Sequence, residues 1–265
     1  MREYSIQGGD EGSIRLDILS RTLEKSTVDF LKSVEFTDTM KALDLGCGTG
    51  KVTALLAEVI GDQGHVLGLD IDELNTQRAT SAAKLKHIKN VTYKTLDAYK
   101  LKSKSKYDLI YSRFLLSHLA NPKIVLENAL NALKSGGKLL IEETDFSGHF
   151  SYPKSDYFDQ YITLYQNLLK KQGANANLGQ SLVNLLMDIG FTEVKFQISQ
   201  PVHRTEEGKL MAEITFKGIS KALMEEKLIT NEEFLEIHSE LVKFRKRKDT
   251  IMSLPRIFQI VAHSP

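Results

Sequence analysis

Cysteine and tryptophan are almost absent from this sequence, and neither sign of charge prevails. The 265 residues include one cysteine and no tryptophan, and 35 basic side chains stand against 34 acidic ones. The single cysteine, Cys47, excludes an internal disulfide and any multi-cysteine metal site, so we predict a reducing compartment and no metal centre. A formal net charge of +1 gives no electrostatic reason to expect nucleic acid or an anionic membrane as the partner.

Long apolar runs are missing as well. No stretch approaches the roughly 18 apolar residues of a membrane span, and the first residues lack the apolar core of a signal peptide. Hydrophobic residues nevertheless make up 42% of the chain, which at this length is enough to build a packed core. We therefore expect a cytoplasmic protein built on one elaborated domain.

Segments with strand character alternate with segments of helical spacing from residue 41 onward. Strands are predicted at 41–46, 65–70, 91–96, 107–112, 138–143 and 191–199, and residues 251–264 are predicted to contain a last strand after a turn at Pro255. Helices are predicted between them at 51–60, 73–87, 121–134 and 178–189. Such alternation is typical of a parallel sheet covered by helices on both faces. With right-handed crossovers, the predicted fold class is α/β, a doubly wound Rossmann-like sheet.

Three segments fall outside this pattern. Residues 1–40 are predicted to form an N-terminal helical cap, with apolar positions at helical spacing from 15 to 34. Residues 41–265 then form the main domain, with helical insertions at 146–177 and 203–248. Both insertions follow strands whose carboxyl ends lie at the ligand-binding edge of an open α/β sheet, so we interpret them as a lid. Simple additional packing is the alternative.

A glycine-rich turn joins the first strand to its helix and is the main chemical motif. The chain passes from Asp44 through Gly46, Gly48 and Gly50 into the helix. Glycines allow positive φ and let a ligand approach the backbone closely. Dinucleotide sites use the same device, but here Lys51 follows where their fingerprint has its third glycine. A carboxylate at position 44 would repel a pyrophosphate, whereas it could accept a hydrogen bond from an ammonium group.

Two more acids end the next two strands. Asp70 ends the second strand and is placed to accept both hydroxyls of a ribose. Asp97 ends the third strand, where its carboxylate can accept from an adenine amino group. Together with the glycine turn, these acids predict a site for an adenosine that carries an amino acid.

At this point the sequence resembles the class I S-adenosylmethionine-dependent methyltransferases, in the ubiquinone- and menaquinone-biosynthesis type of branch. The resemblance rests on ALDLGCGTGKVT, LGLDID, LDAYKL and YDLIYSRFLLSHL, followed by LKSGGKLLIEE. It implies seven strands in the order 3-2-1-4-5-7-6 with the last strand antiparallel, and S-adenosyl-L-methionine as cofactor. The cofactor-binding residues that it implies are Asp44, Gly46, Cys47, Gly48, Gly50, Asp70, Ile71, Asp97, Ala98, Ser112 and Arg113.

The flanks resemble a bacterial subfamily through YSIQGGDEGSIRL, ETDFSGHFSYP and MSLPRIFQ. This second resemblance implies that Tyr4, Gly8, Gly9 and Arg15 fold over the cofactor. We interpret Cys47 as a small side chain packed under the glycine turn rather than as a nucleophile.

Methyl transfer from a sulfonium needs positioning more than it needs an obligatory catalytic side chain. His118 and Glu143 are the candidates for a base or a positioning group. The predicted acceptor-binding residues are His118, Glu143, Asp145, Phe146, His149 and Tyr152. A helix histidine bonded to a backbone carbonyl is the alternative for His118. Tyr157, Tyr161 and Tyr165 share a helix face, for which core packing is favoured over an aromatic substrate wall.

The predicted function is methyl transfer to a small-molecule acceptor by direct in-line displacement, with a homodimer left open. An RNA methyltransferase is the second interpretation, although the basic run at 243–248 fits a solvated helix end better than an RNA contact. A nicotinamide-dependent oxidoreductase would share the sheet and Asp70, but Asp44 and Lys51 argue against it. A non-catalytic cofactor-binding protein is the last alternative.

Overall fold

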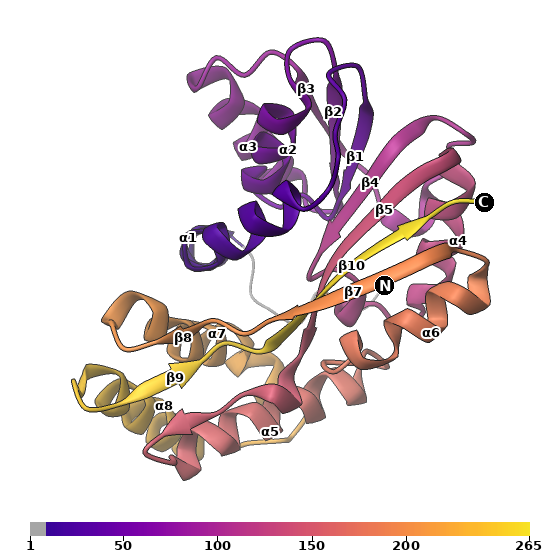
Figure 1. The fold of residues 1–265 in the computed structure, drawn as a ribbon. Helices are drawn as coiled ribbons and strands as arrows, with labels where there is room; N and C mark the ends of the chain where they lie inside the picture. Colours follow the sequence, from indigo (N-terminus) through magenta and orange to yellow (C-terminus); the bar gives the residue numbers. More distant parts are fainter. Residues whose placement is uncertain (1–8) are drawn as a thin grey trace.

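The computed structural model describes residues 9–265 and contains a seven-stranded central sheet (Figure 1). Its strand order, β3-β2-β1-β4-β5-β10-β7, confirms the predicted order. β10 runs antiparallel to both of its neighbours, and the other ladders are parallel, as predicted. The strands are β1 (Lys41–Leu45), β2 (His65–Asp70), β3 (Val91–Thr95), β4 (Tyr107–Arg113), β5 (Leu133–Asp145), β7 (Thr192–Ser199) and β10 (Arg256–His263).

Helices cover both faces of the sheet. One face is covered by α1 (Gly9–Lys32) and α2 (Lys51–Ile60), with α3 (Glu73–Leu85) packed against β2 and β3. The opposite face is covered by α4 (Pro122–Ala132) and α6 (Gly179–Ile189), which meet β5 and β10. Because the inner strands β1, β4 and β5 are covered on both sides, their buried residues form near-continuous runs, whereas the edge strands β3 and β7 are largely exposed.

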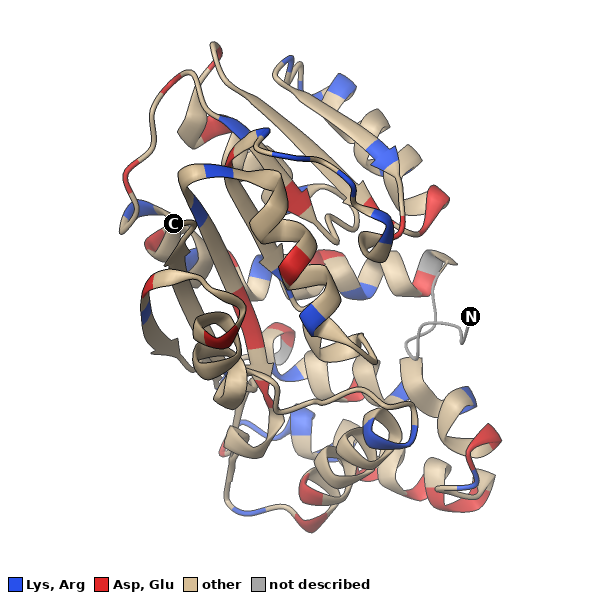
Figure 2. Ribbon diagram, turned by 90° about the vertical axis from the view of Figure 1, so that its right-hand side faces the viewer, with Lys and Arg blue, Asp and Glu red and all other residues tan. Residues whose placement is uncertain are grey.

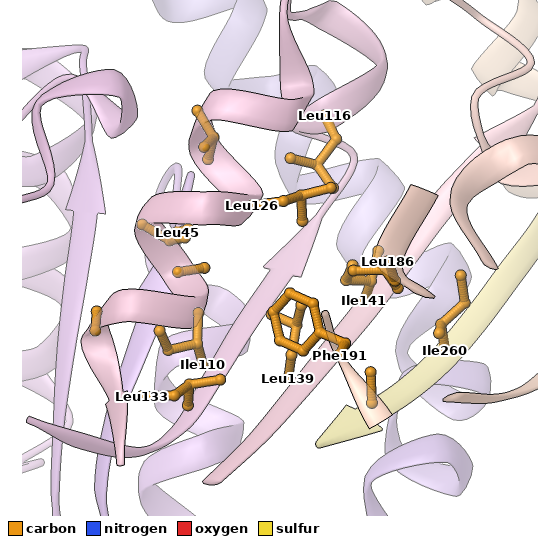
Figure 3. Packing of buried hydrophobic residues seen from close by; sticks show 14 of the residues in the cluster. Leu45, Ile110, Leu116, Leu126, Leu133, Leu139, Ile141, Leu186, Phe191 and Ile260 are labelled. Carbon is orange, nitrogen blue, oxygen red and sulfur yellow. The ribbon is translucent and has the colours of Figure 1, made fainter. Parts of the chain in front are cut away.

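Two apolar cores hold these layers together. Figure 3 shows the core under α4 and α6, where Leu126 of the helix and Phe191 pack over Ile110, Leu139 and Ile141 of the sheet. On the other face, Phe30 and Leu31 of α1 pack with α2 side chains over β1, β2 and β4. All of these side chains are buried. Helices packed on both faces therefore hold the strands in place, and with them the edge of the sheet at which the strands end.

A second group of elements, here called the helical lobe, extends beyond the carboxyl ends of the strands. It comprises α5 (Asp156–Lys171), α7 (Glu206–Glu225) and α8 (Asn231–Lys246), with a small sheet of β6 (Ser151–Tyr152), β9 (Ile251–Ser253) and β8 (Val202–His203). The lobe has its own apolar core, which includes Phe158, Phe216 and Leu241. The predicted insertions therefore pack mainly on one another and lie below the main sheet in Figure 1.

The last strand was predicted within 251–264 after a turn at Pro255, and β10, which begins at Arg256, confirms it. The short strand β9 before the proline was not predicted. Residues 251–253 pair with β6 and β8 in the small sheet, and β10 begins only at Arg256. Pro255 separates the two strands because proline has no N–H to donate to a ladder. The chain thus passes from the helical lobe into the central sheet at this proline.

α1 connects the central sheet to the helical lobe. Its Ile18 and Leu23 pack with Met211 of α7 and with Leu254 and Ile257. Its C-terminal half is tied to the sheet by Thr27, whose Oγ1 donates to Glu142 Oε2 at 2.8 Å. The predicted N-terminal helical segment is therefore a single helix packed between both parts of the molecule. Tyr4 and Gly8, which the flank resemblance placed over the cofactor, lie outside the described residues.

Candidate functional site

A cavity of about 770 Å³ lies at the carboxyl ends of β1, β2 and β4, between the central sheet and the helical lobe. Its wall is made by the glycine turn, the first half of α1, the loop after β4, α5 and α7. Twelve of the residues predicted to bind the cofactor or the acceptor line this one cavity. The sheet side contributes Asp44, Gly46, Cys47, Gly48, Asp70, Ile71, Asp97, Ala98 and Arg113, the segment after β4 contributes His118, and the segment after β5 contributes Phe146 and His149.

The glycine turn is held against β2 by backbone hydrogen bonds. The N–H groups of Gly46 and Cys47 both donate to Leu69 O, at 2.8 and 2.9 Å. Gly48 has φ +51°, and a Cβ there would meet only Leu16 Cδ1, at 3.5 Å. Its open side faces the cavity, so a ligand could approach the Gly48 backbone directly.

Gly50 has a different role. A Cβ at this residue would lie 2.7 Å from Tyr93 Oη and 2.8 Å from Ala79 Cβ, and its φ is +78°. Gly50 does not line the cavity but precedes α2, where it lets the helix start close to β3 and α3. The structure places this predicted cofactor residue in packing behind the turn.

Asp44 is buried at the end of β1, and its Oδ2 accepts from Thr53 Oγ1 at 2.7 Å. Loss of hydration raises the pKa of Asp44 to about 6, against the lowering effects of Thr53 and Arg113. A group with this pKa is still largely ionised at neutral pH. It can accept a charge-assisted hydrogen bond from a ligand ammonium, which would supply the counter-charge it lacks.

Asp70 and Asp97 close the next two strands and are half-buried in the cavity wall. Asp70 accepts from Gly48 N at 2.8 Å and from Asp72 N at 2.9 Å, and burial raises the pKa of its carboxyl group. Asp97 accepts from Tyr99 N at 3.0 Å. Next to Asp70, the Ile71 side chain is 59% exposed, an apolar surface on which a planar ring could lie.

The end of β4 presents Arg113 to the cavity but not Ser112. Alternate residues of a strand face opposite sides, and Tyr111 and Arg113 share the cavity side. Ser112 is buried on the other face, and its Oγ has no hydrogen-bond partner among the described residues. The predicted contact of the Ser112 side chain with the cofactor is therefore not supported by its orientation.

Arg113 is oriented by a buried polar network that sequence reasoning missed. Its Nη1 donates to Thr27 Oγ1 at 3.0 Å, and Thr27 in turn donates to Glu142. Glu142 also accepts from Gln259 Nε2 at 2.7 Å and from the Tyr111 hydroxyl. Four separate segments meet in this network, so no local motif could have revealed it.

His118 and Glu143, the two candidate catalytic residues, are placed differently. His118 lines the cavity, where loss of hydration and the nearby Arg15 lower the pKa of its ring to about 3. Glu143 lies outside the cavity wall, fully buried, and accepts from Ser117 N at 3.1 Å and Thr144 N at 2.9 Å. Glu143 thus holds η2 (Leu116–His118), the short helix that carries His118, and does not face the cavity.

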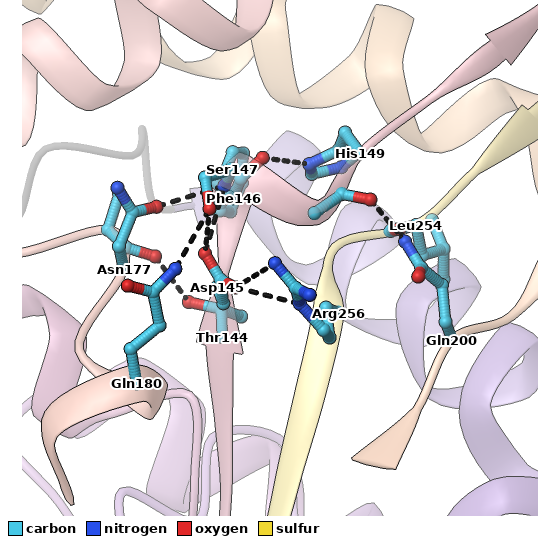
Figure 4. Close-up of polar contacts among 12 residues, drawn as sticks. Thr144, Asp145, Phe146, Ser147, His149, Asn177, Gln180, Gln200, Leu254 and Arg256 are labelled. Carbon is cyan, nitrogen blue, oxygen red and sulfur yellow. Dashed lines mark hydrogen bonds and ion pairs between the residues drawn. The ribbon is translucent and has the colours of Figure 1, made fainter.

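The residues at the end of β5 and just after it also differ in whether they line the cavity (Figure 4). Phe146 and His149 line the cavity, and burial lowers the pKa of His149 to about 4. Asp145 does not: its carboxylate is fully buried, pairs with Arg256 at 2.7 Å and accepts from Ser147 Oγ at 2.6 Å. Tyr152 is 68% exposed and also lies outside the cavity wall. Neither Asp145 nor Tyr152 is positioned to contact an acceptor in this cavity.

The helical-lobe side of the cavity is mainly aromatic and apolar. Tyr161 and Tyr165 of α5 are buried and line it, and Tyr165 stacks on Phe146 at 4.0 Å. Tyr157 points away and donates to Glu236. The facing side of α7 presents mostly small residues at helical spacing, a signal that was readable in the sequence. These residues are Gly208, Met211, Ala212, Thr215, Gly218 and Ala222.

Other kinds of site find little support in the part of the chain that the structure describes. Within residues 9–265, no three His, Cys, Asp or Glu side chains are grouped so as to hold a metal ion. None of the described helices is both long and apolar enough to cross a bilayer. Acidic and basic residues are interspersed over the central sheet and the helical lobe (Figure 2).

Comparison with known sequences gives matches over the half of the chain that contains the glycine turn. The family model described as "Methyltransferase domain" matches residues 36–175, more than half of the chain. The ubiquinone/menaquinone biosynthesis C-methyltransferase UbiE of Vibrio campbellii is 35% identical over 137 residues, 50% of each chain. An uncharacterised methyltransferase of Schizosaccharomyces pombe is 26% identical over 86% of this chain and 81% of its own length. The chain therefore spans only about half the length of some curated relatives.

Comparison with solved structures extends the similarity to nearly the whole fold. The YcgJ protein of Bacillus subtilis superposes with a TM-score of 0.61 at 14% identity, covering 92% of this chain and 98% of that one. Phosphoethanolamine N-methyltransferase 2 of Haemonchus contortus, solved with phosphomonomethylethanolamine and S-adenosylhomocysteine, has a TM-score of 0.62 at 18% identity. The match covers 98% of this chain and 59% of that one. At these identities the likeness establishes a shared fold.

Proposed function

The chain belongs to the methyltransferase-domain family, and from this premise we propose that it is an S-adenosylmethionine-dependent enzyme that methylates a small molecule. The observation that carries the proposal is the arrangement at the cavity's sheet side. Carboxylates from the ends of β1, β2 and the loop after β3 line the same cavity as the open side of Gly48. This set offers one acceptor each for the ammonium, the ribose hydroxyls and the adenine amino group of the cofactor.

The residues fit the cofactor as follows. Asp44 would accept from the ammonium of the methionine part, and Gly48 would let that part lie against the turn. Asp70 would accept from the ribose hydroxyls, with its own orientation already fixed by Gly48 N and Asp72 N. Asp97 and the Ala98 N–H would bind the edge of the adenine, whose face would cover Ile71. Cys47, buried beneath the turn with its thiol pKa raised by burial, would pack and not react.

When bound, the cofactor would supply an electrophilic methyl group on its sulfonium; an acceptor lone pair would bond to the methyl carbon while the C–S bond breaks and its electron pair stays on the sulfur of S-adenosylhomocysteine. The residues of this chain would bring the two reactants together and exclude water. This positioning in a dry site supplies most of the rate enhancement of such a displacement. His118 stands at the junction of the two halves of the cavity. With its pKa lowered to about 3, it is neutral at physiological pH and serves as a hydrogen-bonding group rather than a strong base.

A small-molecule acceptor is favoured by the walls of the cavity. α1, α5 and α7 cover the space above the sheet, and the acceptor side is lined by buried aromatic and small side chains. Two relatives carry names that denote small-molecule acceptors, one in ubiquinone biosynthesis and one a phosphoethanolamine. An RNA methyltransferase would need an exposed basic surface beside the site.

The fold by itself leaves other chemistry open, because one fold supports many reactions. A chain described as the [4+2]-cyclase SpnF superposes at a TM-score of 0.53 and 14% identity. Transfer of the methyl group must therefore be tested separately from binding of the cofactor.

The first test is calorimetric titration of the full chain with S-adenosylhomocysteine and with NADH. We expect one S-adenosylhomocysteine bound per chain and no NADH bound. The second test incubates the protein with methyl-labelled S-adenosylmethionine and either a small-molecule extract or total RNA. Label in an extracted small molecule supports the proposal. Binding of NADH alone would overturn the cofactor assignment, and label only in RNA would overturn the acceptor class.

A further inference from the structure

The seam between α1 and α7 contains three polar contacts, and the middle one differs from the outer two. Glu11 of α1 pairs with Lys217 of α7 at 3.0 Å, and Arg21 of α1 pairs with Glu207 of α7 at 2.7 Å. Between them, Arg15 Nε donates to Thr215 Oγ1 at 3.2 Å. Among the side chains that the structure describes, which do not include Asp10 and Glu206, no carboxylate pairs with Arg15. Lys217 and Arg21 are thus paired with carboxylates, whereas Arg15 contacts a hydroxyl group.

Arg15 is also the residue of this seam that turns into the cavity. It is half-buried and lines the wall together with Thr215, whereas Arg21, Glu207 and Lys217 lie outside. Its Nε is used by Thr215, which leaves the two Nη groups of the guanidinium for a ligand. A guanidinium in such a position carries a positive charge that the surrounding protein does not neutralise.

The position of Arg15 is on the acceptor side. Arg15, His118 and Tyr161 all line the cavity. Burial raises the pKa of Tyr161 and the charge of Arg15 opposes that rise, whereas for His118 the same charge adds to the lowering of the pKa by burial. At the opposite side, burial raises the pKa of Asp44, and Arg113 is the cation that opposes this rise. Arg113 is therefore next to the predicted methionine end of the cofactor, and Arg15 faces the helical lobe.

The walls around Arg15 offer no compensating charge. Phe146, Phe158, Tyr161 and Tyr165 line this side from α5 and η3 (Phe146–Gly148), and Met211 lines it from α7. The acids of this part of the wall, Glu225 at the end of α7 and Glu226 after it, follow Thr215 by ten residues or more. At 1.5 Å per residue, that places them on the order of 15 Å along the helix from Thr215, the residue that Arg15 contacts.

We propose that the methyl acceptor is an organic acid with an aromatic body, and that Arg15 binds its anionic oxygen group. This inference rests on the proposed function. A planar guanidinium with free Nη donors matches a carboxylate, and a pair formed in an apolar-walled cavity is stronger than one in water. The aromatic wall then holds the body of the acceptor. An anion is also attracted to the sulfonium, so the same charge favours approach to the methyl group.

The test uses 2-naphthoate and its neutral analogue 2-naphthamide as probes, titrated into the full chain saturated with S-adenosylhomocysteine. We expect 2-naphthoate to bind at least tenfold more tightly than 2-naphthamide. Arg15→Met should abolish that preference by weakening 2-naphthoate alone. Arg21→Met, on the same helix but outside the cavity, is the matched control and should leave both affinities unchanged. Melting temperatures of the variants report that they are folded.

Three results would overturn the inference. The first is equal binding of the two probes, or binding of neither. The second is retention of the 2-naphthoate preference in Arg15→Met. The third is that Arg15→Met weakens S-adenosylhomocysteine but not 5′-methylthioadenosine, which would place Arg15 on the carboxylate of the cofactor. Failure of the unmodified protein to bind S-adenosylhomocysteine would instead refute the proposed function, so the two failures are distinguishable.

Discussion

At the scale of single residues, burial of the Asp44 carboxylate lowers the stability of the unliganded protein. The folded chain holds its carboxyl group in a site where burial raises the pKa from 3.8 to about 6. Between these values the folded state binds a proton that the unfolded chain has released, so stability falls as the pH rises through this window. A carboxylate retained under such conditions indicates a binding role rather than a structural one.

Asp44→Asn should therefore separate stability from cofactor binding. The amide can still accept from Thr53 but carries no charge to desolvate, so we expect the unliganded variant to be more stable at pH 7 by roughly 1–3 kcal/mol. Affinity for S-adenosylhomocysteine should fall by roughly 10- to 100-fold, because a charge-assisted hydrogen bond is lost. Chemical denaturation and calorimetry measure the two effects. Unchanged affinity would show that Asp44 does not bind the cofactor.

Asp108 provides a control, because the pKa of its carboxyl group is shifted in the direction opposite to that of Asp44. It pairs with Lys134 at 2.6 Å near the surface and accepts from Lys41 N, and these contacts lower the pKa of its carboxyl group. Asp108→Asn should lose stability slightly and leave cofactor affinity intact. In the unmodified protein, affinity should fall about fivefold between pH 6 and pH 5 as Asp44, with a pKa of about 6, is protonated. This component should disappear in Asp44→Asn.

At the scale of elements, the junction of β1 and α2 depends on close contact behind the glycine turn. Gly50→Ala would combine a positive φ with overlap against Tyr93 and Ala79. Gly136→Ala is the matched control, because Gly136 has φ +72° and nothing within 4 Å of the added Cβ. We expect the control to cost about 1–2 kcal/mol and Gly50→Ala roughly 1–3 kcal/mol more. Equal losses in urea denaturation would mean that α2 shifts freely to accommodate the methyl group.

The elements differ in how far local sequence predicted them. α2 and α4 lie within one or two residues of the predicted bounds because their caps and apolar spacing are local properties. β10 was predicted after the turn at Pro255, whereas the three-residue β9 before that turn was not predicted. Which sheet each half joins depends on partners at Ser151 and at Thr144, more than 100 residues away.

At the scale of the whole molecule, α1 closes the cavity from the side and packs on both the sheet and the helical lobe. Hydrogen exchange should reveal this arrangement on addition of S-adenosylhomocysteine. We expect slower exchange at 9–20, 44–50 and 70–72, since these segments line the cavity. α8 is the internal control, because it contributes no side chain to the cavity wall. Protection confined to α8, or spread evenly over all helices, would contradict a ligand bound between sheet and lobe.

The sequence by itself determined the fold class, the strand order implied by the family resemblance, and the identity of the acids beside the glycine turn. These depend on periodicity, on turn chemistry and on residues within a short stretch of chain. The tertiary structure decided which side chains reach the cavity. It turned Arg113 inward and Ser112 away, put Glu143 and Asp145 into buried hydrogen bonds, and brought Arg15 into the cavity wall beside Thr215. Strand and helix orientations of this kind follow from packing between distant segments, which no local pattern encodes.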